Sequence, residues 1–500
     1  MPKRTPSRGE VVAVIDVGSN SGRVVVFQRD AAGHLRTLAG TRASLRLVHD
    51  VDRRGSLSDA TMGRAMEALR DFQAIAMSAG AGRIVAVATA AMRDAANGTL
   101  FADRLRRELG IRIEIIGGND EARFGFNGAV RGLAVSSGLL FDVGGGSMQL
   151  TWFERRHRGK DISLPFGALR LSERFLESDP PSHKQLRRLR DHVRNRLAKA
   201  GVRRLKPGEH LVGTGGTLRN LAKIDRQARN YPIGELHGYE LPVDRLEDVV
   251  ELLASTKEKR RDELPGLSAE RADSIVGGAL AIQTLAEFVR APQILVSGQG
   301  VREGIALGLL GIAVGSPETV KEASISSLVG RFDGWRPEPA ARRRTVAVAL
   351  CRAIAPKAPP AIRAAIEQAA RVLDVGRTFD VVNRHEHVAE ILLSTELNGF
   401  THAELALLSS IVRRAGDRHA EILTLALDAD IGSKLVERAA IILSLADEIE
   451  ARCPHGQAIA IHATTGQAVT LSIPALRSWL ARELEKRFER AFGRSLIVRR

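Results

Sequence analysis

Three consecutive glycines between two short apolar runs restrict the fold of this chain more than any other feature. The stretch reads Phe141-Asp142-Val143-Gly144-Gly145-Gly146-Ser147-Met148-Gln149-Leu150. Each glycine inside a helix or strand would cost roughly 1 kcal/mol relative to alanine, so the three glycines predict a turn between two strands. Backbone N–H groups in such a turn can approach an anion closely, and Asp142 at the strand end can hold a cation. The stretch therefore predicts a site for phosphate and magnesium.

The same pattern occurs near the N-terminus. There, an apolar run leads to Asp16, a turn Gly18-Ser19-Asn20-Ser21 and a second apolar run. One Asp-x-Gly turn is found in many ordinary hairpins, but two copies in one chain predict a duplicated α/β unit. Each half would carry one phosphate-binding hairpin, and the two hairpins would face each other across a cleft. In this respect the chain resembles the superfamily of actin, Hsp70 and the sugar kinases.

Arg93 is a further candidate for phosphate binding. It lies in the stretch 88–98, where a predicted strand ends, and the pattern places it in the first turn of a helix. A cation there opposes the helix dipole, which favours anions at the N-terminus, so Arg93 needs a compensating interaction. A bound phosphate would supply one, and a salt bridge to a neighbouring carboxylate is the alternative.

Two more glycine turns precede predicted helices. Gly117-Gly118 is followed by Asp120 and Glu121, and because capping requires only one carboxylate, the other is free to face the cleft. A third anion cradle is predicted where glycine N–H groups, threonine hydroxyls and a helix N-terminus coincide. Its residues are Gly213, Thr214, Gly215, Gly216 and Thr217.

The length of 500 residues predicts two to four domains. Prolines at 317, 337 and 339 indicate a linker, and apolar periodicity near 3.6 beyond it indicates helices only. We predict an α/β domain over 1–130, a second over 131–312, a linker over 313–344, an all-helical domain over 345–454 and a small α+β piece over 455–500.

Composition adds a clue about partners. Lys and Arg exceed Asp and Glu by sixteen, which indicates a polyanionic partner or simply an arginine-rich composition. Cys351 and Cys453 are too few for a disulfide scaffold, residues 1–8 lack the apolar core of a signal peptide, and no apolar run is long enough to span a membrane. We expect a cytoplasmic protein, a homodimer, with no membrane and no specific nucleic acid among its partners.

Taken together, four motifs resemble the exopolyphosphatase / guanosine pentaphosphate phosphohydrolase family in order and spacing. They are Asp16-Val17-Gly18-Ser19-Asn20-Ser21, the stretch 88–98, Gly118-Asn119-Asp120-Glu121-Ala122-Arg123 and Asp142-Val143-Gly144-Gly145-Gly146-Ser147. The resemblance is strong over 10–312. From about 345 onward the chain is similar, more weakly, to the longer members. The resemblance implies two actin-like (ribonuclease H-like) domains, followed by an all-helical HD-like domain and a small α+β C-terminal piece.

The resemblance also implies a role for each matching residue. Glu121 is the general base that deprotonates water, and Asp16 and Asp142 hold the divalent cation, Mg²⁺ or another. The groups that cradle phosphate oxygens are Ser19, Asn20, Arg93, Gly144, Gly145, Gly146, Ser147, Gly213, Thr214, Gly215, Gly216 and Thr217. Such a site suits phosphoryl transfer, which requires charge neutralisation and a placed nucleophile.

The chain departs from the family at two places. Gln149 stands where the family usually has a carboxylate; its amide can position a water or a hydrated metal but cannot act as a base. In the helical region, the His-Asp pair of true HD phosphohydrolases is replaced by Leu373-Asp374, with His385 or His387 and Asp447 remaining. A second metallo-hydrolase site is therefore not expected, and the domain is predicted to be structural or to bind the polymer.

The leading interpretation is an exopolyphosphatase that releases orthophosphate from the ends of inorganic polyphosphate. The same site would suit removal of the terminal phosphate of guanosine pentaphosphate, and no motif separates the two substrates. A non-catalytic polyphosphate-binding or regulatory protein is a third possibility, because of Gln149, although Glu121 and the glycine turns are retained. A sugar or acetate kinase would need a nucleotide pocket and a phosphoryl acceptor that the sequence does not display.

Overall fold

The computed structural model describes residues 9–500, which form two compact units. The first unit comprises residues up to 230 together with Leu236–Ser324, and the second comprises Tyr231–Glu235 and Ile325–Arg500. None of the helices within the described part of the chain is long and apolar enough to cross a lipid bilayer.

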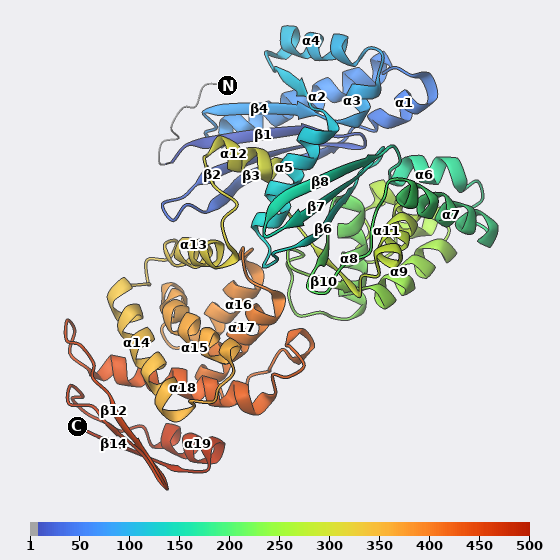
Figure 1. Ribbon diagram of the computed structural model, residues 1–500. Coiled ribbons are helices and arrows are strands. Elements are labelled where there is room, and N and C mark those ends of the chain that lie inside the picture. The colour runs from blue at the N-terminus through green and yellow to red at the C-terminus, as the bar shows by residue number, and fades with distance from the viewer. Residues whose placement is uncertain (1–8) are drawn as a thin grey trace. The chain divides into compact units, whose positions relative to one another are not determined.

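The first unit contains two sheets built on one plan (Figure 1). One sheet has the strand order β3-β2-β1-β4-β5, and the other has the order β10-β11-β9-β6-β7-β8. In each sheet three strands are joined by antiparallel hairpins, and the first strand of that meander pairs in parallel with a later strand. Read from the other edge, the second order is β8-β7-β6-β9-β11-β10, so its first five strands correspond to β3-β2-β1-β4-β5 and β10 is an added edge strand. The first unit is therefore a duplicated α/β architecture.

The bounds of these elements follow the sequence patterns closely. The strands are β1 (Val11–Val17), β2 (Ser21–Arg29), β3 (Leu35–Ser44), β4 (Arg83–Ala88), β5 (Ile113–Ile115), β6 (Gly138–Val143), β7 (Met148–Glu154), β8 (His157–Leu164), β9 (His210–Thr214), β10 (Glu240–Pro242) and β11 (Gln293–Val296). The helices are α1 (Leu47–Arg54), α2 (Asp59–Ser78), α3 (Ala90–Asp94), α4 (Gly98–Leu109), α5 (Gly118–Arg131), α6 (Ala168–Phe175), α7 (His183–Lys199), α8 (Gly216–Ala228), α9 (Val243–Ser255), α10 (Glu258–Arg261), η1 (Ala269–Arg271), α11 (Ile275–Val289) and α12 (Val301–Leu309).

Strand β1 is apolar on both faces because helices cover both. Ala13 and Ile15 belong to a core shared with α2, whereas Val12 and Val14 belong to another core shared with α12. Alternation along a strand sends successive side chains to opposite faces, so a continuous apolar run predicts exactly such two-sided burial.

Helices α5 and α12 cross between the two halves of the first unit. Ile305 and Leu307 of α12 pack on the first sheet, whereas Phe126 and Val130 of α5 pack beside the second sheet. The predicted domain boundaries at 130 and 312 therefore do not follow the packing. Hydrophobic periodicity shows which face of a helix is buried, but it does not show which sheet covers that face.

The two crossing helices meet through glycine. A Cβ atom on Gly128 would lie 1.9 Å from the carbonyl oxygen of Gly300, and one on Gly304 would lie 1.8 Å from the carbonyl oxygen of Phe124. Any side chain at either glycine would separate α5 from α12. This contact fixes the position of the N-terminal end of α5, where Glu121 lies.

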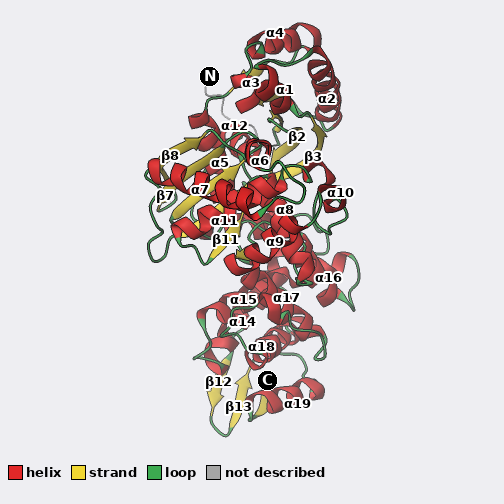
Figure 2. Cartoon of the chain, turned by 90° about the vertical axis from the view of Figure 1, so that its right-hand side faces the viewer, coloured by secondary structure: helices red, strands yellow, loops and turns green. Residues whose placement is uncertain are grey.

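The second unit is mainly helical, and its strands are confined to one small sheet near the C-terminus (Figure 2). Its helices are α14 (Pro337–Ile354), α15 (Pro360–Val372), η2 (Leu373–Thr378), α16 (Arg384–Ser394), α17 (His402–Gly416), η3 (Thr424–Ala426), α18 (Ser433–Arg452) and α19 (Arg482–Phe492). Its sheet has the order β12 (His462–Thr465), β13 (Ala468–Ser472), β14 (Ser495–Arg499). The sheet side chains Leu471 and Leu496 share one core cluster with the helices, so 345–454 and 455–500 do not have separate cores.

The predicted linker over 313–344 is largely helical. It contains α13 (Pro317–Val329) and the first residues of α14. Pro317 and Pro337 are the first residues of these helices, where proline is tolerated because the first N–H groups of a helix have no intrahelical partner. The prolines indicated a linker in the sequence, but in the structure they begin helices.

Candidate active site

Two hairpin loops line one cavity in the first unit. Gly18, Ser19 and Asn20 come from the β1–β2 loop, and 144–147 come from the β6–β7 loop. Each loop closes in the same way: the N–H of Gly18 donates to the Ser21 carbonyl at 3.1 Å, and the N–H of Gly144 donates to the Ser147 carbonyl at 3.0 Å. The sequence predicted this pair of facing turns from the repeated Asp-x-Gly pattern.

In each loop, one carbonyl group accepts a hydrogen bond from an N–H group at the start of a helix, α1 or α6. The N–H of Val48 donates to the Ser19 carbonyl at 3.0 Å, and the N–H of Leu169 donates to the Gly145 carbonyl at 3.1 Å. By contrast, four N–H groups of the loops donate to no acceptor within residues 9–500, namely those of Ser19, Asn20, Gly145 and Gly146. The loops therefore offer backbone donors to an anion, as glycine-rich turns commonly do.

Three carboxylates adjoin these loops. Asp16 and Asp142 are the penultimate residues of strands β1 and β6, and Glu121 lies in the first turn of α5. Its neighbour Asp120 is exposed and bonded to Arg123 at 2.7 Å, so Glu121 is the carboxylate of the pair that faces the cavity.

The environment of Glu121 makes its protonation state sensitive to neutral pH. Burial, followed by the negative charges of Asp142 and Asp16, raises the pKa of Glu121 to about 7, although Arg93 opposes the shift. The Oε2 atom of Glu121 is buried without a hydrogen-bond partner among the described residues, and its ion pair with Arg93 Nη1 is 3.7 Å long. Burial likewise raises the pKa values of Asp16 and Asp142.

Four arginines that the sequence analysis did not assign to the site also line the cavity. They are Arg23 on β2, Arg219 on α8, Arg271 in η1 and Arg302 on α12. None of them forms an ion pair with a carboxylate of residues 9–500. Burial and the charges of neighbouring arginines lower the pKa values of Arg23 and Arg219 to about 10. Such a group of unpaired cations favours a polyanionic ligand.

Two of these arginines carry the same local signal in the sequence as Arg93. Arg219 and Arg302 lie in the first turns of α8 and α12, directly after glycine turns, where a cation opposes the helix dipole. Arg23 and Arg271 carry no comparable local signal, because only the tertiary fold brings β2 and η1 to the cavity.

In the third glycine turn, 213–217, Thr214, Gly215 and Gly216 line the cavity, whereas the other two residues do not. A Cβ atom on Gly215 would lie 2.4 Å from Asp142 Oδ1, and one on Gly216 would lie 2.1 Å from Arg271 Nη2, so these glycines admit the two charged side chains. Gly215 also has a φ of 97°, which favours glycine. Thr214 lines the cavity, and its hydroxyl donates to the Gln299 carbonyl at 2.7 Å.

Gly213 and Thr217, predicted to bind phosphate, do not line the cavity. A Cβ atom on Gly213 would lie 2.4 Å from the Phe141 ring, and Thr217 is fully buried. These two residues pack the turn from behind. A glycine motif in a sequence does not separate glycines needed for packing from glycines needed for a ligand.

Arg93 and Gln149 also lie outside the lining of the cavity. Arg93 is the fourth residue of the five-residue helix α3, and its Nη1 donates to the Ile116 carbonyl at 2.9 Å. The buried Gln149 donates from Nε2 to Ser163 Oγ at 3.0 Å, and its Nε2 lies 3.8 Å from where a Cβ of Gly118 would be. Both side chains therefore adjoin α5, the helix that carries Glu121.

A family model described as the Ppx/GppA phosphatase family matches residues 25–312. The chain belongs to this family. It is 31% identical to exopolyphosphatase 1 of Mycobacterium leprae over 59% of this chain and 88% of that protein, and 33% identical to exopolyphosphatase 2 of Mycobacterium tuberculosis over 60% and 98%. The structure is similar to that of the Ppx/GppA enzyme of Aquifex aeolicus, with a TM-score of 0.52 and 27% identity over 60% of this chain and 99% of that one.

The donor set of this Ppx/GppA cavity fits a cation that is only partly held by protein. Within residues 9–500 no three His, Cys, Asp or Glu side chains are grouped closely enough to enclose a metal ion. Asp16 and Asp142 are nevertheless two half-buried carboxylates that line the cavity beside the loops. Two carboxylates suit Mg²⁺, which keeps several waters and takes its remaining ligands from substrate phosphates.

Residues 325–500 of the second unit lie outside the family match, and their buried charges are paired with one another. Asp374 accepts hydrogen bonds from Arg343 at 2.6 Å and Arg384 at 2.8 Å, and Asp447 is paired with the same two arginines. Burial and the charge of Arg384 lower the pKa of nearby His385 to about 4. Asp374 and Asp447, the carboxylates that a second metal site would need, are therefore ion-paired with arginines.

Proposed function

We propose that this member of the Ppx/GppA family is an exopolyphosphatase, which hydrolyses the terminal phosphoanhydride bond of inorganic polyphosphate and releases orthophosphate. The observation that carries the proposal is a cavity in which four unpaired arginines and two glycine-rich loops surround Glu121. The relatives named above, which are called exopolyphosphatases, support the choice of substrate. A chain of phosphates carries a charge on every unit, and such a substrate would neutralise several of these arginines together.

We assign to Glu121 the role of general base. Its carboxylate takes a proton from water while the water oxygen attacks the terminal phosphorus. The bond from that phosphorus to the bridging oxygen then breaks, and the shortened polyphosphate leaves with the electron pair. A pKa of about 7 supports this role, because a base acts best when its pKa is near the working pH.

The phosphate contacts are assigned to the loops and the arginines. Backbone N–H groups of Ser19, Asn20 and 145–147, with those of Thr214, Gly215 and Gly216, bind phosphate oxygens, while Gly144 closes its loop through the bond to the Ser147 carbonyl. Arg219 and Arg302 neutralise the charge that the reaction displaces. In this scheme Arg93 holds Glu121 in position instead of binding phosphate, because it is bonded to the Ile116 carbonyl and faces Glu121.

Asp16 and Asp142 are assigned to a divalent cation, for which we propose Mg²⁺. When bound, the cation would polarise the phosphoryl group and neutralise part of its charge. Gln149 supports this arrangement from behind, since it lies opposite Asp142 in the β6–β7 pairing and contacts the start of α5.

The remaining proposals concern the whole chain. The two α/β halves are of the actin-like type, and the helical unit is a degenerate HD-like domain with a structural role. We also propose that the protein is a cytoplasmic homodimer.

The proposal is tested by incubating the purified protein with long-chain polyphosphate and Mg²⁺ and measuring released orthophosphate. We expect steady release that stops when EDTA removes the cation. Guanosine pentaphosphate is assayed beside it, and a higher kcat/KM for the nucleotide would overturn the choice of substrate. Absence of release from either compound would overturn the proposed chemistry.

A further inference from the structure

The two sides of the active-site cavity carry opposite charge. A neighbouring hollow shares Asn20 with the cavity, and its lining includes two arginines, Arg46 and Arg261, against five carboxylates. These carboxylates are Glu173, Glu177, Asp179, Glu258 and Asp273. A long polyanion that left the cavity on this side would meet net negative charge, which would repel it.

Helix α8 also lines the cavity, and it carries three cations along one helical face. Arg219, Lys223 and Arg226 are spaced i, i+4 and i+7, so their side chains share that face. Arg219 lines the cavity and is half-buried, whereas Lys223 is exposed. The face therefore leads from the cavity to the surface, and Arg226 lies about 10 Å beyond Arg219 along the helix axis.

Further cations surround this face. Arg42 of β3 lies opposite the cavity residue Arg23 in the strand pairing and forms an ion pair with Glu270 at 3.3 Å. Burial, and then the positive charges of Arg219, Arg226 and Arg42, lower the pKa of Lys223. Neither Lys223 nor Arg226 forms an ion pair within the described part of the chain, and the Nη1 atom of Arg226 is buried without a hydrogen-bond partner there.

We infer that a bound polyphosphate chain leaves the cavity along α8, where Lys223 and Arg226 contact phosphates beyond the reacting end. The inference rests on the proposed function and specifies the path of its substrate. Arg219, Lys223 and Arg226 lie on one helical face without an ion-pair partner among residues 9–500, which is unfavourable, and a polyanion lying across them would remove their repulsion. The chemistry of the contact is that of lysine and arginine with a non-esterified phosphate chain.

The test compares long polyphosphate with tripolyphosphate in the double variant Lys223→Ala/Arg226→Ala. A tripolyphosphate held at Glu121 is too short to extend to Arg226, so it serves as the internal reference. We expect the ratio of KM for long polyphosphate to KM for tripolyphosphate to rise roughly fivefold at low salt, in keeping with two partly exposed charge contacts. Release of condensed counterions also predicts that log KM for the long chain depends less steeply on log salt, by about 1.5 in slope.

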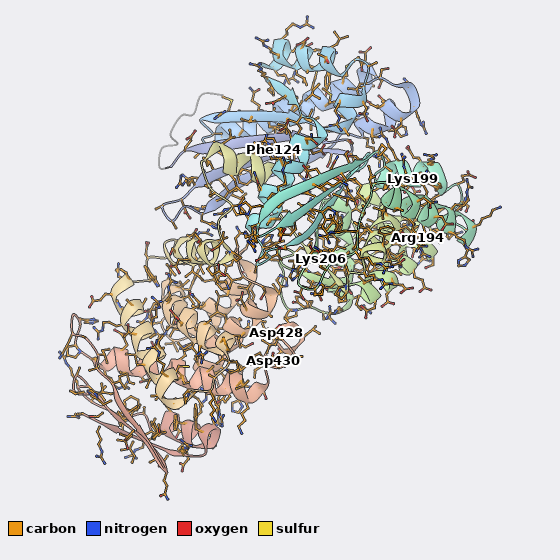
Figure 3. The ribbon with its side chains drawn as sticks, viewed as in Figure 1. Phe124, Arg194, Lys199, Lys206, Asp428 and Asp430 are labelled. Carbon is orange, nitrogen blue, oxygen red and sulfur yellow. The ribbon has the colours of Figure 1, made fainter. Side chains whose placement is uncertain are left out.

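The matched control is Arg194→Ala/Lys199→Ala. Both residues are exposed cations of α7 that do not line the cavity, and they are labelled in Figure 3. The control removes the same net charge and the same two residue types. We expect its KM ratio and salt slope to equal those of the wild type, and thermal unfolding to confirm that both double variants are folded.

Three outcomes separate the possibilities. A rise in the KM ratio confined to the α8 variant supports the path along α8. An unchanged ratio in that variant, or an equal rise in the control, overturns the path while leaving the exopolyphosphatase activity intact. Absence of phosphate release from both substrates by the wild type would instead overturn the proposed function, so the two failures are distinguishable.

Discussion

Each unit of the protein buries a carboxylate, and the two carboxylates show opposite behaviour. Burial and neighbouring negative charges raise the pKa of Glu121 in the first unit. Burial would also raise the pKa of Asp374 in the second unit, but the charge and hydrogen bond of Arg343 outweigh burial and lower it. Glu121 has one distant cation at 3.7 Å, whereas Asp374 has three arginines within 2.8 Å.

The comparison shows how the same residue types give a site in one place and a scaffold in another. In the first unit, the four arginines that line the cavity form no ion pair with a carboxylate of residues 9–500, and the cavity carboxylates Asp16 and Asp142 have raised pKa values. In the second unit the carboxylates and Arg343 are paired in a buried cluster, in which Arg343 is fully buried. Unpaired charges suit a ligand, whereas paired charges suit the core of the protein.

The largest expected effect is on stability, in the second unit. Asp374→Asn should destabilise the protein by about 3–5 kcal/mol at pH 7, because it leaves buried arginines without their counter-charge. The pKa of Asp374 is lowered on folding, so its contribution is present above the unfolded pKa and is lost as pH falls through the folded value. Urea unfolding at pH 7 and at lower pH measures this loss, and equal stability of variant and wild type at pH 7 would contradict the comparison.

The next largest effect concerns Glu121. We expect Glu121→Gln to lower kcat at least ~10²-fold, because the amide cannot accept the proton of the attacking water. Polyphosphate binding should survive the change. Orthophosphate release under saturating substrate measures it, and near-normal turnover would assign the base to another residue.

The same variant should be more stable than the wild type. The pKa of Glu121 is raised from 4.5 to about 7 on folding, so the folded state binds the proton more tightly and stability falls as pH rises between these values. Glu121→Gln should therefore gain on the order of 3 kcal/mol at pH 8 and nothing near pH 4. Asp374→Asn provides the control with the opposite sign, and a loss of stability in Glu121→Gln at pH 8 would refute the comparison.

A smaller effect is expected from a cavity arginine. Arg219→Ala should raise the KM for polyphosphate roughly tenfold, as expected for the loss of one charge-assisted contact. Its effect on the free energy of unfolding should be small, since Arg219 forms no ion pair among residues 9–500, and burial and the charge of Arg302 outweigh the attraction of Glu303 and Asp142. Kinetics and urea unfolding of this variant distinguish a ligand-binding arginine from a structural one, and a large loss of stability with an unchanged KM would identify the latter.

The smallest expected effect is a shift in pH dependence. The ionised form of Glu121 is the active base, so kcat should rise with pH through about 7. Gln149→Glu adds a negative charge opposite Asp142 and should move this rise by about one pH unit to higher pH. A variant that needs less Mg²⁺ for half-maximal activity would indicate that the new carboxylate also supports the cation, and a general loss of activity at every Mg²⁺ concentration would show that the amide is required.

Local sequence signals predicted the parts of the site that local structure builds. The two hairpins followed from Asp-x-Gly turns between apolar runs, and Glu121 followed from two acids at one helix start. These features depend on neighbours in the chain, and the structure places Asp16, Asp142, Glu121 and both loops around one cavity. The phosphate and metal roles assigned to them stay predictions.

The parts that the sequence did not predict depend on contacts between distant segments. Arg23 and Arg271 reach the cavity only because β2 and η1 meet there. Helix α12 packs on the first sheet and α5 beside the second, and the two helices are in close contact at Gly128 and Gly304. Gly213 and Thr217 were predicted to bind phosphate because they belong to the same glycine motif as Thr214, Gly215 and Gly216, which line the cavity. The sequence of the motif does not show which of its residues serve packing. Pro317 and Pro337 indicated a linker because proline both interrupts helices and begins them.

The most direct test of the account is calorimetric titration of polyphosphate into Glu121→Gln, which binds the substrate without consuming it. We predict binding that weakens at least about tenfold when Arg219→Ala is added and that is unchanged when the exposed Lys199→Ala is added instead. Equal affinity in all three proteins, or no binding in the first, would contradict the claim that the unpaired arginines of the first unit form a polyanion site.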